Sequence, residues 1–272
     1  RQLRDRPVDW VICALPWEKQ DDVSLVARVC NDFGVHFSLL LSEIIPWTWV
    51  RAKVDEYREI PLLTFTTIPM KHWALFIKDI LDRFLALVFI VITFPLMVVI
   101  ACLIKLTSPG PVLFVQDRCG KNGRIFKMYK FRSMYVDAEK RKRELERLNE
   151  MKGVVFKVRR DPRVTPLGRI IRRFSLDELP QLFNILKGEM SFVGPRPPLP
   201  EEVAKYEPWQ RRRLAMKPGL TCLWQIKGRN EIADFDEWVK LDLEYIDNWS
   251  LWLDIKLILQ TLPVVISGRG AY

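Results

Sequence analysis

The longest apolar stretch of the chain runs from Phe84 to Ile104. None of its 21 residues is charged, and it contains one proline, Pro95, near the middle. A straight helix of this length, at about 1.5 Å per residue, would cross the roughly 30 Å of a bilayer's hydrocarbon core. Proline inside a helix removes one backbone hydrogen bond and clashes with the preceding turn, so a break is predicted at Pro95. The pattern therefore predicts a helix–break–helix membrane anchor.

Positive charges flank both ends of this stretch. Lys71, Lys78 and Arg83 precede it and Lys105 follows it, and such charges mark the cytoplasmic side of a membrane segment. A re-entrant anchor places both ends on that side, whereas a spanning helix places only one end there. The flanks favour the re-entrant form, and the spanning form stays open because kinked spanning helices are common.

Two segments next to the anchor or near the C-terminus have the periodicity of helices. Residues 70–83 gather Trp73, Phe76, Ile77 and Ile80 on one face, which predicts an interfacial helix that leads into the anchor. Residues 251–266 are apolar but contain two charged residues, so an interfacial or core helix is expected rather than a span.

The segment Glu202–Arg213 is also predicted to be an amphipathic helix at the membrane surface. Tyr206 and Trp209 are residue types that favour the interface, and the three consecutive arginines from Arg211 to Arg213 suit anionic headgroups. Together with residues 70–83, this segment predicts a unit that lies against the membrane.

The first 69 residues alternate between strand-like and helix-like runs. Residues 8–15 and 35–41 are predicted to be buried strands with a helix over 21–33 between them, which makes a βαβ unit, and 59–68 is a further strand. A Rossmann-like nucleotide site needs glycines after the first strand, where this sequence has proline and tryptophan. We therefore expect a partial Rossmann-like α/β domain that does not bind a nucleotide.

Residues 112–131 are predicted to form a β-hairpin, because Asn122 and Gly123 are the residues that a type I′ turn prefers at its two positive-φ positions. The highly charged run 136–152 is predicted to be a solvated helical insertion without chemistry. The fold class expected from all these patterns is α+β and membrane-associated, with three parts: a partial Rossmann-like domain over 1–69, the interfacial helix and re-entrant anchor over 70–110, and a further domain over 111–272 that begins with the hairpin.

Charge is distributed unevenly over the chain. From Lys105 to Lys217 there are 27 Lys and Arg against 13 Asp and Glu, a difference of +14, while the whole chain carries +10. Such a field favours phosphate-bearing partners such as lipid headgroups, nucleotides or nucleic acid. The five cysteines form no CxxC pair and the chain has two histidines, so neither a disulfide framework nor histidine chemistry is expected. Because the chain begins with Arg1 instead of Met, we expect a fragment of a longer protein.

The densest candidate chemistry lies in residues 159–186. Ser175 and Glu178 have the spacing of a helix capping box, which is a purely structural interpretation. The alternative is a phosphoryl-transfer site, in which Asp177 is an ionised nucleophile beside a second acid and arginines neutralise the phosphate. The surplus of cations favours this alternative: Arg159, Arg160, Arg163, Arg169, Arg172 and Arg173 all precede the pair. In the following segment 192–198, prolines flank Arg196, which is either a substrate-binding residue on a rigid loop or a surface residue in a tight turn.

Four segments together resemble the polyprenyl-phosphate hexose-1-phosphate transferases, which are monotopic bacterial phosphoglycosyl transferases. They read FVQDRCGKNGRIFKMYKFRSM, RIIRRFSLDELPQLFNILKGEMSFVGPRP, KPGLTCLWQIKGR and YIDNWSLWLDIKLILQTLPVVISGRGAY. The resemblance covers about residues 70–272. The N-terminal region is similar to the end of the extra cytoplasmic domain of larger, multi-helix members, which implies an N-terminally truncated form.

The resemblance implies roles for particular residues. It makes Asp177 the nucleophile, with Glu178 as its partner in the dyad, and places Mg²⁺ at Asp177. It also implies a re-entrant helix that is broken at Pro95. The substrate-binding residues that it implies are Lys130, Arg172, Pro195, Arg196 and Pro197.

The implied reaction is ping-pong transfer of hexose 1-phosphate from a UDP-hexose to undecaprenyl phosphate, with release of UMP, as the first membrane step of exopolysaccharide, O-antigen or capsule synthesis. The implied location is the cytoplasmic face of the bacterial inner membrane. The expected partners are the two substrates and the bilayer, with no nucleic acid and with a homodimer left open. Glucose and galactose are the hexoses that the resemblance favours.

Two other interpretations compete with this one. Asp234 and Asp236 form a DxD pattern, with which metal-dependent glycosyltransferases hold a nucleotide diphosphate, although the same residues suit a solvated helix face. A membrane-attached basic module that binds nucleic acid or anionic lipid would explain the charge. It would not explain the acidic pair or the Pro-Arg-Pro turn.

Overall fold

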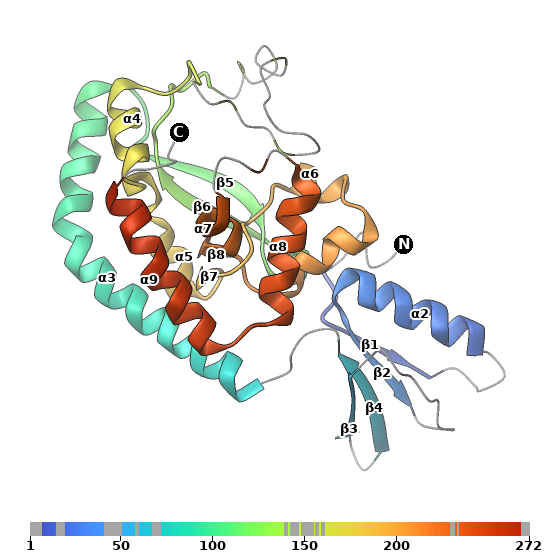
Figure 1. Cartoon of the computed structure of the whole chain (residues 1–272). Helices are drawn as coiled ribbons and strands as arrows, with labels where there is room; N and C mark the ends of the chain where they lie inside the picture. Colours follow the sequence, from blue (N-terminus) through green and yellow to red (C-terminus); the bar gives the residue numbers. More distant parts are fainter. Residues whose placement is uncertain are drawn as a thin grey trace.

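The computed structural model of the chain describes residues 7–14, 20–40, 51–57, 60–66, 72–138, 141, 147, 155, 158, 161–228, 232 and 234–267. A small α/β unit forms the N-terminal end, and a long helix leads from it into a larger unit of helices and short strands (Figure 1). The mixture of helices and sheets that the sequence predicts is confirmed.

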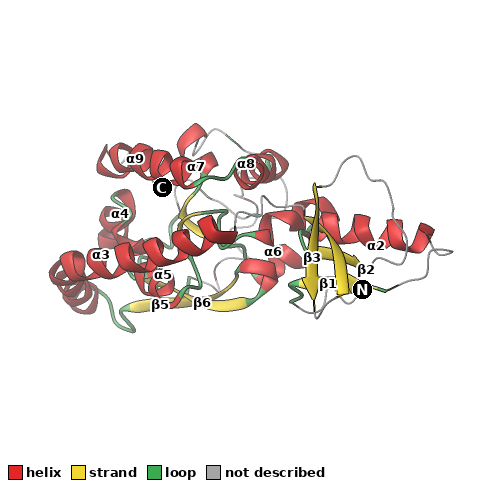
Figure 2. Ribbon diagram, turned by 90° about the horizontal axis from the view of Figure 1, so that it is seen from below, coloured by secondary structure: helices red, strands yellow, loops and turns green. Residues whose placement is uncertain are grey.

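The small unit contains the predicted βαβ arrangement. Strands β1 (Trp10–Cys13) and β2 (His36–Leu40) are parallel, and helix α2 (Gln20–Phe33) connects them and lies against the sheet (Figure 2). Strand β4 (Ile60–Thr66) pairs antiparallel with β2. Strand β3 (Arg51–Tyr57), which was not predicted, pairs antiparallel with β4. Because two of these three pairings are antiparallel, the Rossmann-like interpretation stays a prediction.

The apolar stretch lies within one helix, α3 (His72–Thr107), which continues through Pro95 without leaving the helical conformation. Figure 1 shows that α3 changes direction along its length. Pro95 cannot donate a backbone hydrogen bond, and two residues before it the Thr93 hydroxyl donates to the Phe89 carbonyl at 2.7 Å, both of which bend helices. Among the described residues, Trp73–Thr107 is the one helical segment long and apolar enough to cross a membrane.

One stripe of α3 is buried along almost its whole length. Lys78 and Asp82 begin this stripe, and Ala86, Ile90, Met97, Ile100 and Ile104 continue it at helical spacing on both sides of the proline. The opposite side exposes apolar residues, and the most apolar part of the helix is only 17% buried. The larger unit therefore covers one face of α3 from beginning to end. The exposed apolar residues include Trp73, Phe76, Phe84, Val91, Ile92, Phe94 and Leu106.

The predicted hairpin is confirmed by antiparallel strands β5 (Leu113–Cys119) and β6 (Ile125–Phe131). Asn122 and Gly123 adopt positive φ of 56° and 77°, as expected. The connection differs from a two-residue turn, because it is a 3₁₀ turn (η2, Lys121–Gly123) that Gly120 closes by donating to the Arg124 carbonyl at 2.7 Å. Most of the predicted charged helix over 136–152 lies outside the described residues.

The remaining elements are short and surround the hairpin and α3. Two of them are parallel strands that pair with each other, and the helices pack around three apolar clusters. The elements are α4 (Pro166–Arg173), η4 (Leu176–Glu178), α5 (Gln181–Lys187), β7 (Ser191–Val193), α6 (Pro200–Ala204), η5 (Pro208–Ala215), β8 (Gly219–Thr221), α7 (Leu223–Gly228), α8 (Phe235–Asp247) and α9 (Leu251–Ser267).

The prediction of an interfacial helix over 202–213 is wrong. This segment is divided between α6 and η5, and Tyr206 is 4% exposed and Arg213 3% exposed. Arg213 forms a buried ion pair with Asp242 and donates to the Tyr206 hydroxyl at 2.9 Å. These polar groups are thus used to hold η5 to α8 and do not contact a membrane surface.

A buried ion pair holds α3 to the C-terminal helix α9. Lys78 lies 2.5 Å from Asp254, which also accepts hydrogen bonds from Tyr245 at 2.7 Å and Trp249 at 3.2 Å. Lys78 is therefore not one of the flanking charges that face the membrane. The helix predicted over 251–266 is confirmed, and its outward face exposes apolar side chains, among them Trp252, Ile255 and Leu259.

Candidate active site

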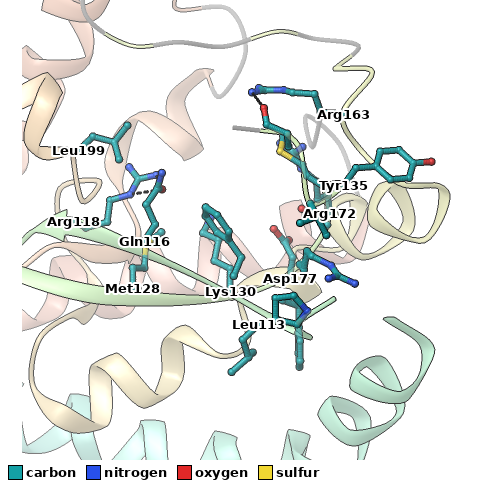
Figure 3. A pocket seen from close by; sticks show the side chains of 18 of the residues that line it. Leu113, Gln116, Arg118, Met128, Lys130, Tyr135, Arg163, Arg172, Asp177 and Leu199 are labelled. Carbon is teal, nitrogen blue, oxygen red and sulfur yellow. Dashed lines mark hydrogen bonds between the residues drawn. The ribbon is translucent and has the colours of Figure 1, made fainter. Parts of the chain in front are cut away.

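A cavity of about 690 Å³ opens between the hairpin, the η4 turn, the Pro-Arg-Pro loop and α6 (Figure 3). This volume lies within the range of pockets that enclose a small-molecule ligand. Asp177, Arg172, Lys130 and Arg196 all line the cavity, although they come from separate parts of the chain. The structure therefore brings together the main residues of the predicted site.

One face of the hairpin forms a wall of the cavity. Phe114 lies opposite Lys130 and Gln116 opposite Met128 in the strand register, so the side chains of these four residues share a face. Arg118 continues the same face by the alternation of β5 and also lines the cavity. The periodicity of two along each strand thus aims one amide and two positive charges at a single space.

The nucleophile candidate lies on a tight turn between two helices. Thr165 caps α4 by accepting from the Gly168 amide at 2.9 Å, and α4 ends at Arg173. Ser175 then adopts the left-handed conformation at φ 54° and ψ 21°, which is uncommon for a residue with a Cβ atom and is often found near functional sites. This reversal starts the η4 turn and buries Asp177 at 8% exposure.

The capping box, which was the structural alternative for Ser175 and Glu178, is not formed. The Ser175 side chain makes no capping hydrogen bond, because the left-handed backbone of this residue is not the extended conformation that an N-cap needs. Asp177 lies in the 3₁₀ turn η4, which precedes α5.

Asn184 fixes the position of the hairpin relative to this turn. This fully buried residue of α5 accepts from the Tyr129 amide at 3.0 Å and donates to the Lys127 carbonyl at 2.7 Å. Its side chain therefore replaces a neighbouring strand at the centre of β6. The next residue along the cavity face of β6, Lys130, is held beside η4 as a result.

Lys130 and Glu178 form an ion pair with 2.6 Å between Nζ and Oε1, and both side chains are about a quarter exposed. The adjacent Asp177 is more deeply enclosed, and burial raises the pKa of its carboxyl group to about 6, with Lys130 opposing the rise and the negative charge of Glu178 adding to it. Near neutral pH, Asp177 is mostly ionised, and it lacks much of the hydration that would weaken it as a nucleophile.

The predicted arginines differ in their positions. Arg172 lines the cavity, and its Nη1 is buried without a hydrogen-bond partner in the described part of the chain. Arg163 also lines the cavity but pairs with Asp161 at 2.6 Å. Arg169 and Arg173 are exposed. Arg159 and Arg160 lie outside the described residues.

The Pro-Arg-Pro loop is held rigidly at its backbone. The Pro195 carbonyl accepts from the Gly219 amide and the Pro197 carbonyl from Arg118 Nη1, both at 2.9 Å. The two prolines are buried, while Arg196 lines the cavity and its guanidinium lies 5.9 Å from the centre of the Trp238 ring. The loop thus presents a single positive side chain to the site, as the sequence predicts.

Arg118, Gln116, Glu202 and Lys205 also line the cavity, and sequence reasoning did not select them. For Arg118 and Gln116 the signal was present, since alternation along the predicted hairpin places both on the same side as Lys130. For Glu202 and Lys205 it was absent, because their segment was predicted to be one helix at the membrane.

The site offers few ligands for a metal ion. Among the described residues, no group of three or more His, Cys, Asp and Glu side chains is arranged to hold one. Mg²⁺, however, usually binds through one or two carboxylates together with substrate phosphates and water. Asp177, with Glu178 adjacent to it, fits such a site when a diphosphate substrate supplies the other oxygens.

The competing acidic pair has a structural role. Asp234 caps α8 by accepting from the Asp236 amide at 2.9 Å, and Asp236 accepts from Gln210 at 2.6 Å. Both residues are exposed, and neither lines the cavity. The arrangement favours the solvated helix face over a diphosphate-binding DxD motif.

Comparisons with known proteins give consistent results. A profile described as bacterial sugar transferase matches residues 73–268. The undecaprenyl-phosphate glucose phosphotransferase of Komagataeibacter xylinus is 41% identical over the whole of this chain and 51% of its own length. The galactosyl transferase CpsE of Streptococcus agalactiae is 59% identical over 60% of this chain, and the undecaprenyl-phosphate galactose phosphotransferase of Salmonella typhimurium is 40% identical over 79%. The chain spans about half or less of the length of these relatives, 36% and 45% for the last two.

Proposed function

This chain belongs to the bacterial sugar transferase family, the polyprenyl-phosphate hexose-1-phosphate transferases, and from that premise we propose that it transfers hexose 1-phosphate from a UDP-hexose to undecaprenyl phosphate. The observation that carries the proposal is the cavity in which a buried carboxylate, Asp177, is combined with Lys130, Arg172 and Arg196. A nucleotide sugar needs both a nucleophile for its phosphorus and positive charge for its phosphates. The names of the relatives supply the sugar, glucose or galactose, and the lipid acceptor.

In the first step, a carboxylate oxygen of Asp177 attacks the β-phosphorus of the UDP-hexose. A bond forms between that oxygen and phosphorus, the bond from phosphorus to the bridging oxygen breaks, and UMP leaves with the electron pair. Lys130 holds Glu178 through its 2.6 Å ion pair, and this orients the acidic pair during the attack. The guanidinium groups of Arg172 and Arg196 compensate the negative charge of the phosphates.

In the second step, a phosphate oxygen of undecaprenyl phosphate attacks the same phosphorus. The bond between phosphorus and Asp177 breaks, the carboxylate is regenerated and undecaprenyl-diphospho-hexose leaves. Mg²⁺, when it is bound at Asp177, supplies positive charge that neutralises the diphosphate oxygens. Burial keeps water away from Asp177, which protects the phosphosugar from hydrolysis between the two steps.

The anchor of this enzyme is re-entrant, with both ends of α3 on the cytoplasmic face of the inner membrane. The support is the buried stripe of α3, which continues from Lys78 to Ile104 on both sides of Pro95. A spanning helix would be surrounded by lipid over about 30 Å and would leave the catalytic unit behind. A helix that packs on the catalytic unit throughout holds the site near the headgroups, where the acceptor phosphate lies. A homodimer stays a prediction.

The experiment that tests this proposal is release of UMP from a panel of UDP-sugars in the presence of undecaprenyl phosphate. We expect UMP with UDP-glucose or UDP-galactose, and none from the Asp177→Asn variant, which still binds the membrane. A glycosyltransferase would release UDP, and a binding module would release neither nucleotide. Substantial formation of UMP by the Asn variant would exclude Asp177 as the nucleophile.

A further inference from the structure

Asn184 of α5 is fully buried between this helix and the hairpin. Its Oδ1 accepts from the Tyr129 amide at 3.0 Å, and its Nδ2 donates to the Lys127 carbonyl and to Glu189 Oε2, both at 2.7 Å. The side-chain amide thereby uses its oxygen and both of its N–H donors on the protein itself. Little hydrogen-bonding capacity is left for a ligand, so the role of Asn184 is to hold parts of the chain together.

The two backbone groups that Asn184 contacts are neighbours along one edge of β6. In a strand, a carbonyl and the amide two residues further on point to the same side, and the pair from Lys127 and Tyr129 faces α5. The Asn184 amide therefore binds β6 as a peptide group of a third strand would. Met128 lies between the two bonds, and Lys130 is the next residue on the same face of β6.

The backbone of Asn184 also holds the chain beyond α5. Its carbonyl accepts from the Glu189 amide at 3.0 Å and from the Met190 amide at 3.4 Å, where the chain turns into β7. At its other end, α5 begins shortly after η4, the turn that carries the acidic pair. One residue thus connects the strand that carries Lys130, the turn that carries the nucleophile and the segment that leads to the Pro-Arg-Pro loop.

Apolar contacts bring β6 and α5 together but do not fix their relative position. Met128 of β6 belongs to the same buried cluster as Leu182 and Ile185 of α5, and the burial of apolar surface is non-directional. Hydrogen bonds that are fully satisfied in a buried place select one arrangement of such elements. A shift of β6 by one residue would turn Lys130 to the other face of the strand, away from Glu178.

We infer that Asn184 is a positioning residue for the first step of the reaction: it sets the place of β6 relative to η4, so that Lys130 meets Glu178 at 2.6 Å. The inference rests on the proposed function, which assigns that step to Lys130 and the acidic pair. Asn184 does not contact the substrates and acts through Lys130. Displacement of a reacting group by about 1 Å can lower a rate about 100-fold. Loss of the two bonds to β6 should therefore lower kcat more than it raises the KM for the UDP-hexose.

The test is a double-mutant cycle on the rate of UMP release by the full chain in detergent. Asn184→Leu keeps a similar side-chain volume and removes all three hydrogen bonds of the side chain. It is expected to lower kcat by about 10- to 100-fold and to change the KM for the UDP-hexose by less than about threefold. In the Lys130→Met background the same change should lower kcat by less than about threefold, because the residue through which Asn184 acts is already lost.

Ile185→Ala is the matched control, because it leaves a cavity at the neighbouring buried position of α5 and removes no hydrogen bond to β6. Its kcat should stay within about twofold in both backgrounds. The double variant Asn184→Asp with Glu189→Gln keeps an acceptor for the Tyr129 amide and a hydrogen bond between residues 184 and 189, and it loses the donor to Lys127. Its kcat should lie between those of the unchanged protein and Asn184→Leu. If Asn184→Leu does not fold, this double variant takes its place in the cycle.

An effect of Asn184→Leu on kcat that is equally large with and without Lys130 would overturn the inference. An increase in KM alone, or an equal loss of kcat in Ile185→Ala, would do the same. These results would leave the proposed function intact, because Lys130→Met by itself tests the part of Lys130 in the reaction. If Lys130→Met left kcat unchanged, that part of the proposed function would fail together with the inference.

Discussion

At the scale of single residues, the decisive feature is the carboxyl group of Asp177, which is ionised near neutral pH although burial disfavours its charge. Burial raises the pKa of Asp177 to about 6, and Lys130 limits the rise. In the reaction that we propose, only the carboxylate form of Asp177 attacks phosphorus, so activity depends on deprotonation of this group. This dependence gives two predictions about pH and one about stability.

The decrease in activity at acidic pH should reflect protonation of Asp177. We expect kcat/KM for the UDP-hexose to increase with pH, with a midpoint near 6, and to level off above it, because the nucleophile is protonated below this pH. The measurement is the initial rate of UMP release between pH 4.5 and 8. A profile that stays flat through pH 6, or an activity that falls as the pH rises through it, would contradict this role.

Lys130→Met should move that midpoint to higher pH. Removal of this positive charge leaves burial and the charge of Glu178, which raise the pKa of Asp177, opposed only by Arg172 and a backbone hydrogen bond. Lys127→Met in the same strand is the control, since its exposed side chain pairs with Asp117 at 3.7 Å and is not near the site. A midpoint that is the same in all three proteins would show that Lys130 does not tune the nucleophile.

The buried charge also costs stability. The pKa of Asp177 is about 6 in the folded protein, and that of an unfolded Asp is about 3.9; folding therefore becomes less favourable as the pH rises from 4 to 6, and the loss persists at neutral pH. Asp177→Asn should consequently stabilise the protein by about 3 kcal/mol at pH 7.5, and the gain should shrink toward pH 4. Thermal unfolding of both proteins at the two pH values is the check, and a destabilised variant at pH 7.5 would be the opposite result.

Much of the site could be predicted at this scale, and the predictions that failed did so for local reasons. Asp177, Glu178 and Arg172 are close in sequence, so their order along one turn is enough to bring them together. The contact between Lys130 and Glu178 joins residues 48 positions apart and needed the resemblance to known transferases. The capping box failed because Ser175 adopts a left-handed conformation, which spacing alone does not reveal.

At the scale of elements, the arrangement is explained by what each helix and strand buries. The hairpin and the long helix were predicted because alternation and apolar length are strong local signals. Strand β3 was not predicted, because Arg51–Tyr57 carries four charged residues and is stabilised as a strand by its pairing with β4. Residues 202–213 have the composition of an interfacial helix, but Arg213 finds its partner, Asp242, 29 residues further along the chain.

The attachment of α3 to α9 should be a major contribution to stability. Lys78→Met removes the cation from two buried carboxylates, Asp254 at 2.5 Å and Asp82 at 3.4 Å. Asp254 keeps its neutral donors, Tyr245 and Trp249. We expect a loss of about 3 kcal/mol in the free energy of unfolding, because breaking a buried ion pair on one side leaves an uncompensated charge. Lys105→Met at the exposed end of α3 should cost less than about 0.5 kcal/mol. Equal effects of the two changes in denaturant titrations would refute the argument.

At the scale of the whole molecule, the candidate active site belongs to the unit that packs against one face of α3. The exposed faces of α3 and α9 are both apolar, and the ion pair between Lys78 and Asp254 joins the two helices. Sequence patterns predicted a membrane anchor and favoured its re-entrant form, but they did not predict that a buried ion pair joins α3 to α9.

The topology can be measured directly. Tags placed at Arg1 and at Tyr272 should both be accessible from the cytoplasm and protected from reagents on the outer side of the inner membrane, because the re-entrant anchor that we propose enters and leaves on the same face. Labelling of intact cells with an impermeant reagent, before and after permeabilisation, is the measurement. Labelling of one tag from outside would mean that α3 spans the membrane.

The central claim is that Asp177 carries the sugar phosphate between the two substrates. The most direct measurement is mass spectrometry of the full chain after incubation with UDP-hexose in the absence of lipid acceptor. The account predicts one hexose phosphate bound to Asp177, one equivalent of UMP released for each adduct, and loss of the adduct when undecaprenyl phosphate is added. Complete turnover without any adduct, or an adduct on another residue that persists in the Asp177→Asn variant, would contradict it.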